Sequence, residues 1–161
     1  MRHTAAVAAR ADKSAVTVAP ADRDVLVAAA WLHDIGYAEA LRDTGFHPLD
    51  GARHLEQLGW PRRVCALVAH HSGARLVAGV LGLVDQLDAY PHEDDAVSDA
   101  LTYADQTVDN KGRRVTIRVR LEDMFRRHGP DSPNGRGHHL RAPHLLAVAD
   151  RVERRRLARR S

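Results

Sequence analysis

The chain has 161 residues, of which 44% are hydrophobic and 28% are charged, and its formal net charge is +3. This length and composition predict one soluble domain with a single core. The only cysteine, Cys65, excludes an internal disulfide, and we expect a buried, inert thiol in a cytoplasmic protein. We find neither a signal peptide nor an apolar run approaching roughly 18 residues, so we expect no membrane partner.

Helical periodicity and helix-breaking residues divide the chain into a series of short helices. Pro20, Gly45, Gly59 and Pro91 fall between apolar segments, and Pro48 suits a first helical turn. We therefore expect an all-α fold, with helices near residues 2–12, 21–35, 37–43, 48–58, 61–72, 74–88, 93–110, 116–127 and 141–158. The only plausible strand is "RRVTIRV" at 113–119, and its flanks fit entry into a helix equally well.

The C-terminal third differs in composition from the rest. Residues 126–143 are rich in Gly, Pro and polar side chains, which predicts a loop before a last helix. That helix would pack on the core or on a second subunit, so a homodimer through it is one alternative. Its basic sequence "RVERRRLARR" is interpreted as a solvated face. A nucleic-acid partner is disfavoured because aromatic residues, which stack on bases, make up only 4% of the chain.

The helix expected at 21–35 is apolar on nearly every side, yet it carries His33 and Asp34. Leu26 and Ala30 lie behind them on the same faces, which predicts a buried position. A carboxylate there costs several kcal/mol unless it is paired with a cation, hydrogen-bonded or bound to a metal ion. Further candidate ligands lie on helix faces or at helix ends: His3, His47, His70, His71 and Asp105. Mixed imidazole and carboxylate ligands favour Fe, Mn, Co, Ni or Zn over Ca or Mg.

The order of these residues resembles the HD-domain superfamily of metal-dependent phosphohydrolases. "WLHDIGY" carries the HDIG form of its motif, followed by "HPLDGARHL", "VAHHSGA" and "LTYADQTVDN". The resemblance implies an HD-type helical core at 1–112, with the metal site between central helices. Residues 113–161 would then be a C-terminal helical extension, with its Gly/Pro-rich loop near 128–143. One or two divalent transition metal ions are implied.

The resemblance also implies individual roles. The first ion would be held by His3, His33, Asp34 and Asp105. The second would be held by Asp34, which bridges the two ions, together with His47 and His70. His33 and Asp34 are the implied catalytic residues. His71 is ambiguous because periodicity places it on the apolar stripe while the family pattern favours His70, so we rank it second, as a ligand or a substrate contact.

Some features depart from the family pattern. Many hydrolytic members have Lys shortly after the HD pair, where this chain has Tyr37 and Ala38. The Gly-Tyr-Pro signature of cyclic-dinucleotide phosphodiesterases does not follow "HHSGARL", which excludes that branch. His3 is so near the first residue that we expect either a start further upstream or a loosely held ligand. Lys111 and Arg113 follow Asp105 and could contact an anionic substrate, although a solvated turn explains them as well.

We therefore expect a phosphohydrolase that cleaves a phosphate ester or anhydride of a small molecule, such as a nucleotide, through metal-activated water. The alternatives are a di-iron HD-type oxygenase that cleaves a C–C or C–P bond and a non-catalytic HD-fold binding or dimerisation module. The remaining histidines are expected at the surface or in the flexible loop: His54, His92, His128, His138, His139 and His144.

Overall fold

A computed structural model describes residues 2–159 of the chain. Within that range the secondary structure consists of α-helices and short 3-10 turns, with no strand. A single isolated antiparallel bridge joins Val108 to Arg114 at the start of the "RRVTIRV" segment, and the helix after it begins at Ile117. The all-α prediction is confirmed.

The α-helices are α1 (Arg2–Ser14), α2 (Arg23–Leu32), α3 (His47–Gln57), α4 (Arg62–His70), α5 (Ala74–Leu81), α6 (Val84–Leu87), α7 (Ala96–Gln106), α8 (Ile117–His128), α9 (Pro133–Arg136) and α10 (His138–Ala158). The 3-10 turns are η1 (Ala15–Thr17), η2 (Pro20–Asp22), η3 (Ile35–Tyr37), η4 (Glu39–Leu41) and η5 (His71–Gly73). The acidic segment before α7 provides its N-cap, since the Asp95 side chain accepts hydrogen bonds from the backbone N–H groups of Val97 and Ser98.

Three helix predictions and one loop prediction need correction. The segment expected as a helix at 37–43 contains only the 3-10 turn η4 and the end of η3. The helix expected at 21–35 ends at Leu32, so His33 and Asp34 lie in the turn that follows it. The helix expected at 74–88 is interrupted at Gly82, whose left-handed conformation (φ 70°) ends α5. The loop expected at 126–143 contains α9 and the first turns of α10, with Pro143 inside that helix.

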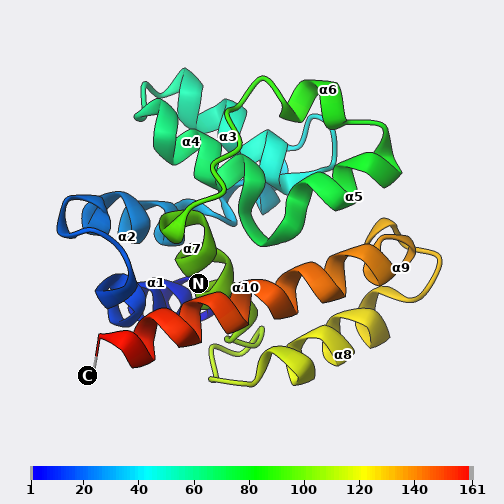
Figure 1. Cartoon of the computed structure of the whole chain (residues 1–161). Coiled ribbons are helices and arrows are strands. Elements are labelled where there is room, and N and C mark those ends of the chain that lie inside the picture. Colours follow the sequence, from blue (N-terminus) through cyan, green and yellow to red (C-terminus); the bar gives the residue numbers. More distant parts are fainter. Residues whose placement is uncertain (1, 160–161) are drawn as a thin grey trace.

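The hydrophobic core forms around α4, which is apolar on nearly every side. Val64 and Leu67 pack in a cluster with α1, α2 and α7, whereas Cys65 and Val68 pack in a second cluster with α3, α5 and α6. Figure 1 shows α3, α4, α5 and α6 together in the upper part of the view, with α7 below them near its centre. Burial raises the pKa of the Cys65 thiol, in keeping with the inert role expected for it.

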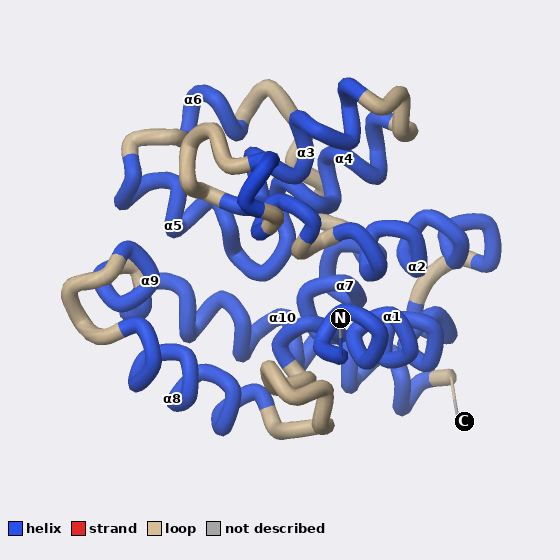
Figure 2. The backbone as a smooth tube through the Cα atoms, turned by 180° about the vertical axis from the view of Figure 1, so that it is seen from behind, coloured by secondary structure: helices blue, strands red, loops and turns tan. Residues whose placement is uncertain are grey.

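The C-terminal helices pack against the rest of this chain. α8 and α10 lie alongside each other and are connected through α9 (Figures 1 and 2). α10 also crosses α7, where the buried Asp99 accepts hydrogen bonds from Arg151 and Arg155. The last helix therefore covers the core of its own subunit. A homodimer through this helix stays a prediction, as does a domain boundary at 112.

Residues Arg62–Leu81 reach the length and mean hydropathy, 1.4, of a membrane span, contrary to the expectation from sequence. However, 72% of the most apolar 18-residue stretch in this segment is buried inside the protein. The left-handed residues Ser72 and Gly73 also separate α4 from α5. These are features of core helices in a soluble protein.

Candidate metal centre

Histidines and aspartates from distant parts of the chain converge near the centre of the molecule. They form two groups of three, and within each group the candidate ligand atoms lie within 4.8 Å of one another. The first triad is His3, His33 and Asp105, and the second triad is Asp34, His47 and His71. His3 comes from α1, Asp105 from α7, His47 from the first residue of α3, His71 from η5, and the His33–Asp34 pair from the turn after α2.

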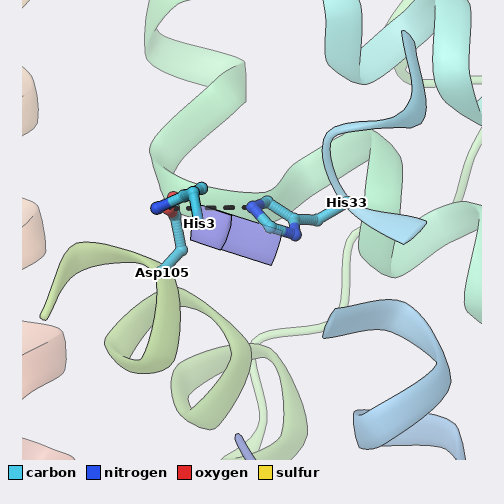
Figure 3. Close-up of side chains that lie close together, drawn as sticks. All are labelled: His3, His33 and Asp105. Atoms are coloured by element: carbon cyan, nitrogen blue, oxygen red, sulfur yellow. Dashed lines mark hydrogen bonds and ion pairs between the residues drawn. The ribbon is translucent and has the colours of Figure 1, made fainter. Parts of the chain in front are cut away.

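The first triad is the more deeply buried. Figure 3 shows His3, His33 and Asp105 pointing toward one another. The Nε2 atom of His3 lies 3.1 Å from Oδ1 of Asp105, and the Nε2 atom of His33 lies 3.8 Å from the same oxygen. Three potential ligand atoms therefore face a common point between α1, α2 and α7.

The hydrogen bonds around this triad fix which nitrogen of each imidazole faces inward. Nδ1 of His3 donates to the backbone carbonyl of Asp109 at 2.9 Å, and Nδ1 of His33 donates to that of Ala30 at 2.8 Å. Nε2 of His33 is fully buried and has no hydrogen-bond partner among the described residues. A backbone carbonyl that accepts from Nδ1, with Nε2 left unpartnered, is the usual arrangement of a metal-binding histidine.

In the second triad, His71 is oriented in the same way as His3 and His33. Nδ1 of His71 donates to the carbonyl of Val68 at 2.6 Å, which directs its Nε2 inward. That Nε2 lies 3.3 Å from Nε2 of His47, which in turn lies 3.6 Å from Oδ1 of Asp34. Two facing imidazole nitrogens repel each other unless a proton or a cation lies between them. The ring of His47 stacks on Tyr37, with centroids 3.8 Å apart.

Asp34 connects the two triads through its two oxygens. Oδ2 lies 3.3 Å from Nε2 of His33 and 3.7 Å from Nε2 of His3, whereas Oδ1 faces His47. Ligands that share an ion with bond lengths of about 2.0–2.2 Å lie about 3.0–3.5 Å apart. The distances between ligand atoms are therefore close to those of a loaded site. The residues fit one or two transition metal ions.

The electrostatics of the site favour a cation. Burial lowers the pKa of His33, but the carboxylates of Asp34 and Asp105 outweigh it and raise that pKa to about 9. Burial raises the pKa of Asp105, but the hydrogen bond from His3 and the charges of His33 and Arg120 hold it well below its usual range. Burial dominates at His47 and lowers its pKa to about 3. The carboxylates that attract a proton to His33 would equally attract a divalent ion.

Gly36 allows the turn that carries Asp34 to pack closely against the helix that carries His47. A Cβ atom at this position would lie 2.1 Å from the carbonyl oxygen of His47 and 2.6 Å from the backbone nitrogen of Gly51. No side chain fits there, so η3 packs directly on α3. This contact brings Asp34 beside His47. It explains why the position in "HDIG" is occupied by glycine, which has no Cβ atom.

Ser72 holds the first triad from the other side. It is the only non-glycine residue with a positive φ, 55°, in the described part of the chain. Its hydroxyl donates to Oδ2 of Asp105 at 2.5 Å, and the side-chain amide of Gln106 donates to the same oxygen at 2.7 Å. The other oxygen, Oδ1, remains directed at the triad. An unfavourable backbone conformation kept at such a position is typical of a functional site.

The structure brings His71 into the second triad and does not bring His70. Nε2 of His70 donates to the carbonyl of Tyr90 at 2.9 Å, and its ring lies 4.7 Å from that of His92, outside both triads. The ranking of His70 ahead of His71 is thereby reversed. Apolar periodicity alone does not separate the two histidines, since both are buried.

The candidate substrate contacts also need revision. Arg113 pairs with Asp109 at 2.8 Å, and Lys111 lies with it beside a separate surface pocket rather than at the triads. Instead, a cavity of about 540 Å³ opens onto the triads and is closed on its far side by α8, α9 and α10. This is within the usual size of a small-molecule site. Its lining contains residues that sequence reasoning missed, notably Arg120 and Arg141.

The described residues are helical, and two linked His/Asp triads that could hold metal ions lie at the base of a cavity. A family model for the HD domain matches residues 1–155, nearly the whole chain. The protein therefore belongs to the HD-domain superfamily. No curated protein and no solved structure matches it.

Proposed function

We propose that this protein is a metal-dependent phosphohydrolase that cleaves a phosphate ester or anhydride of a small molecule, such as a nucleotide. The observation that carries the proposal is the position of Asp34, whose two oxygens face different triads beside a cavity. The ions would be held by His3, His33 and Asp105, by His47 and His71, and by Asp34 between them. When bound, they supply Lewis acidity, which activates water near neutral pH and offsets charge on a phosphoryl group.

The protein's own contribution is to hold these ligands in place before a substrate arrives. Ala30, Val68 and Asp109 each accept a hydrogen bond from Nδ1 of one imidazole. The three rings therefore cannot rotate without losing a buried hydrogen bond, which costs about 1–3 kcal/mol. Such preorganisation is how a metal site keeps its ligands ready for catalysis.

The test combines elemental analysis with turnover. We expect about one to two equivalents of a transition metal per chain and hydrolysis within a panel of phosphorylated metabolites. Treatment with a chelator should abolish both, and adding the metal back should restore both. Bound metal without hydrolysis of any panel member would count against the proposal.

A di-iron oxygenase remains the second candidate, because the two triads provide six ligands and Asp34 lies between them. Measurement of dioxygen uptake separates the two, since a hydrolase consumes none. The non-catalytic alternative predicts that less than about half an equivalent of metal binds and that reconstitution does not increase it. We further propose a cytoplasmic location and no nucleic-acid partner, on the single buried thiol and the low aromatic content.

A further inference from the structure

Arg120 is a buried cation whose hydrogen bonds are largely unmade. Its side chain, which extends from α8, is 9% exposed. Nε and Nη1 are buried and have no hydrogen-bond partner within residues 2–159. Nη2 lies 3.8 Å from Oδ1 of Asp105, at the limit of an ion pair. A guanidinium has five N–H donors, and leaving them unpaired in the interior is costly.

Arg141 faces the same cavity from α10. Its Nε donates to the carbonyl of Ser72 at 2.8 Å and its Nη1 donates to Asn134 at 3.3 Å. These bonds fix the guanidinium beside η5, the turn that carries His71, and they leave Nη2 for another acceptor. Two arginines from the C-terminal helices therefore lie opposite the ligands from α1, α3 and α7.

The charges that line the metal-loaded cavity would favour an anionic ligand. Two carboxylates are present, Asp34 and Asp105, and both belong to the triads. Arg127 also lines the cavity, but it pairs with Asp123 at 2.8 Å. Arg120 and Arg141 thus balance the two carboxylates, and each divalent ion adds two uncompensated positive charges. This excess of positive charge attracts a dianion more strongly than a monoanion.

We propose that Arg120 and Arg141 form the receptor for a dianionic phosphoryl group, which makes the substrate a phosphomonoester rather than a phosphodiester. This inference rests on the proposed function. Arg120 has unpartnered Nε and Nη1 atoms, and a guanidinium donates two parallel hydrogen bonds to a phosphate, while Arg141 adds its Nη2. Val77, Leu81 and Met124 line the same cavity and would contact the organic part of the substrate.

Binding of inorganic phosphate to the metal-loaded protein tests the receptor directly. Isothermal titration calorimetry should show that Arg120→Gln weakens phosphate binding about tenfold to a hundredfold at unchanged metal content. Arg141→Gln should weaken it by a similar factor, and Arg120→Lys should lose less because it keeps the charge. Arg126→Gln is the matched control, since Arg126 is exposed on α8 and pairs with Asp123 outside the cavity. It should bind phosphate within twofold of wild type.

Thermal denaturation separates this role from a structural one. A receptor residue with unmade hydrogen bonds contributes little to stability without its ligand, so Arg120→Gln should melt within about 3 °C of wild type in the absence of phosphate. Phosphate should raise the melting temperature of wild type and of Arg126→Gln more than that of Arg120→Gln. Equal phosphate affinity in Arg120→Gln and wild type would contradict the proposal that Arg120 binds the phosphoryl group.

Turnover distinguishes the receptor from the proposed function. Among active substrates, monoesters should have the lower KM, and Arg120→Gln should raise that KM about tenfold or more. Preferred hydrolysis of diesters would overturn the inference and leave the phosphohydrolase standing. Phosphate binding that depends on the arginines, without hydrolysis of any substrate, would support the receptor and count against the phosphohydrolase.

Discussion

The two triads are built from the same residue types but differ in burial and support. In the first triad, the side chain of His33 is 0% exposed and that of Asp105 is 8% exposed. In the second triad, Asp34 and His47 are 24% and 21% exposed and line the cavity. In the first triad, His3, His33 and Asp105 each form a hydrogen bond to a neighbouring group, whereas His47 of the second triad stacks on Tyr37.

This difference separates two roles within one centre. The first triad joins α1 to α7 across more than a hundred residues of sequence, so an ion bound there would also hold the fold together. Both triads line the cavity, but Asp34 and His47 of the second triad are the more exposed to it, so a substrate reaches that triad more readily. We therefore expect the first ion to be retained tightly and the second to exchange more readily.

Asp34→Ala should have the largest effect, because it removes the one carboxylate shared by both triads. We expect tight binding of both ions to be lost and turnover to fall by about a thousandfold or more. Elemental analysis and turnover check this outcome. Asp85→Ala, on an exposed part of α6, is the matched control and should behave as wild type. Retained phosphatase activity in Asp34→Ala would refute the assignment of the centre.

Single-histidine variants should separate the triads. His47→Ala should lose one equivalent of metal and keep the other, with little change in melting temperature. His3→Ala should lose the buried ion and also melt several degrees lower, because α1 then loses its connection to α7. Elemental analysis and calorimetry provide the readouts, and His54→Ala on α3 serves as the control. Identical losses in the two variants would mean that the triads act as a single site.

Gly36→Ala tests the contact that joins the triads. A methyl group 2.1 Å from the carbonyl oxygen of His47 forces η3 away from α3. We expect a loss of about 2–4 kcal/mol in the free energy of unfolding and a preferential loss of the second ion. Gly79→Ala is the control, because an added Cβ there meets nothing within 4 Å and should stabilise α5 slightly. Equal free energies of unfolding in the two variants would contradict the view that Gly36 is needed for the close contact between η3 and α3.

The sequence predicts most of this centre, for identifiable reasons. His33 and Asp34 stand out because they interrupt an apolar helix, and the ordered motifs lead to His3, His47 and Asp105. The choice between His70 and His71 is not predictable in this way. It depends on where α4 ends and on a left-handed serine, which are set by the hydrogen bonds of Ser72 to Thr102 and Asp105.

The cavity side of the site is less predictable still. Arg120 and Arg141 lie in segments whose local pattern indicates only a helix face and a loop. Their positions depend on tertiary packing: α10 is held against α7 by buried apolar side chains and by the pairs of Asp99 with Arg151 and Arg155. Packing also keeps residues 133–136 and 138–143 helical despite their Gly and Pro content.

Ser72 offers a smaller test of the first triad. Ser72→Ala removes the hydroxyl that holds Asp105 but keeps the unfavourable backbone, whereas Ser72→Gly removes both. We expect each variant to bind the first ion about tenfold to a hundredfold more weakly. The glycine variant should be more stable than the alanine variant by about 1 kcal/mol. Metal titration and calorimetry measure the two effects. Wild-type affinity in both variants would show that Gln106 alone positions the carboxylate.

His70→Ala should have the smallest effect on the metals, although His70 is adjacent to a proposed ligand. Its ring donates to the carbonyl of Tyr90 and lies outside both triads. We therefore expect metal affinity within about twofold of wild type and a loss of about 1–3 kcal/mol in stability, because a buried carbonyl loses its donor. His71→Ala should instead lose the second ion. A loss of metal in His70→Ala with none in His71→Ala would mean that the turn after α4 presents the other imidazole, and the second triad would have to be rebuilt around His70.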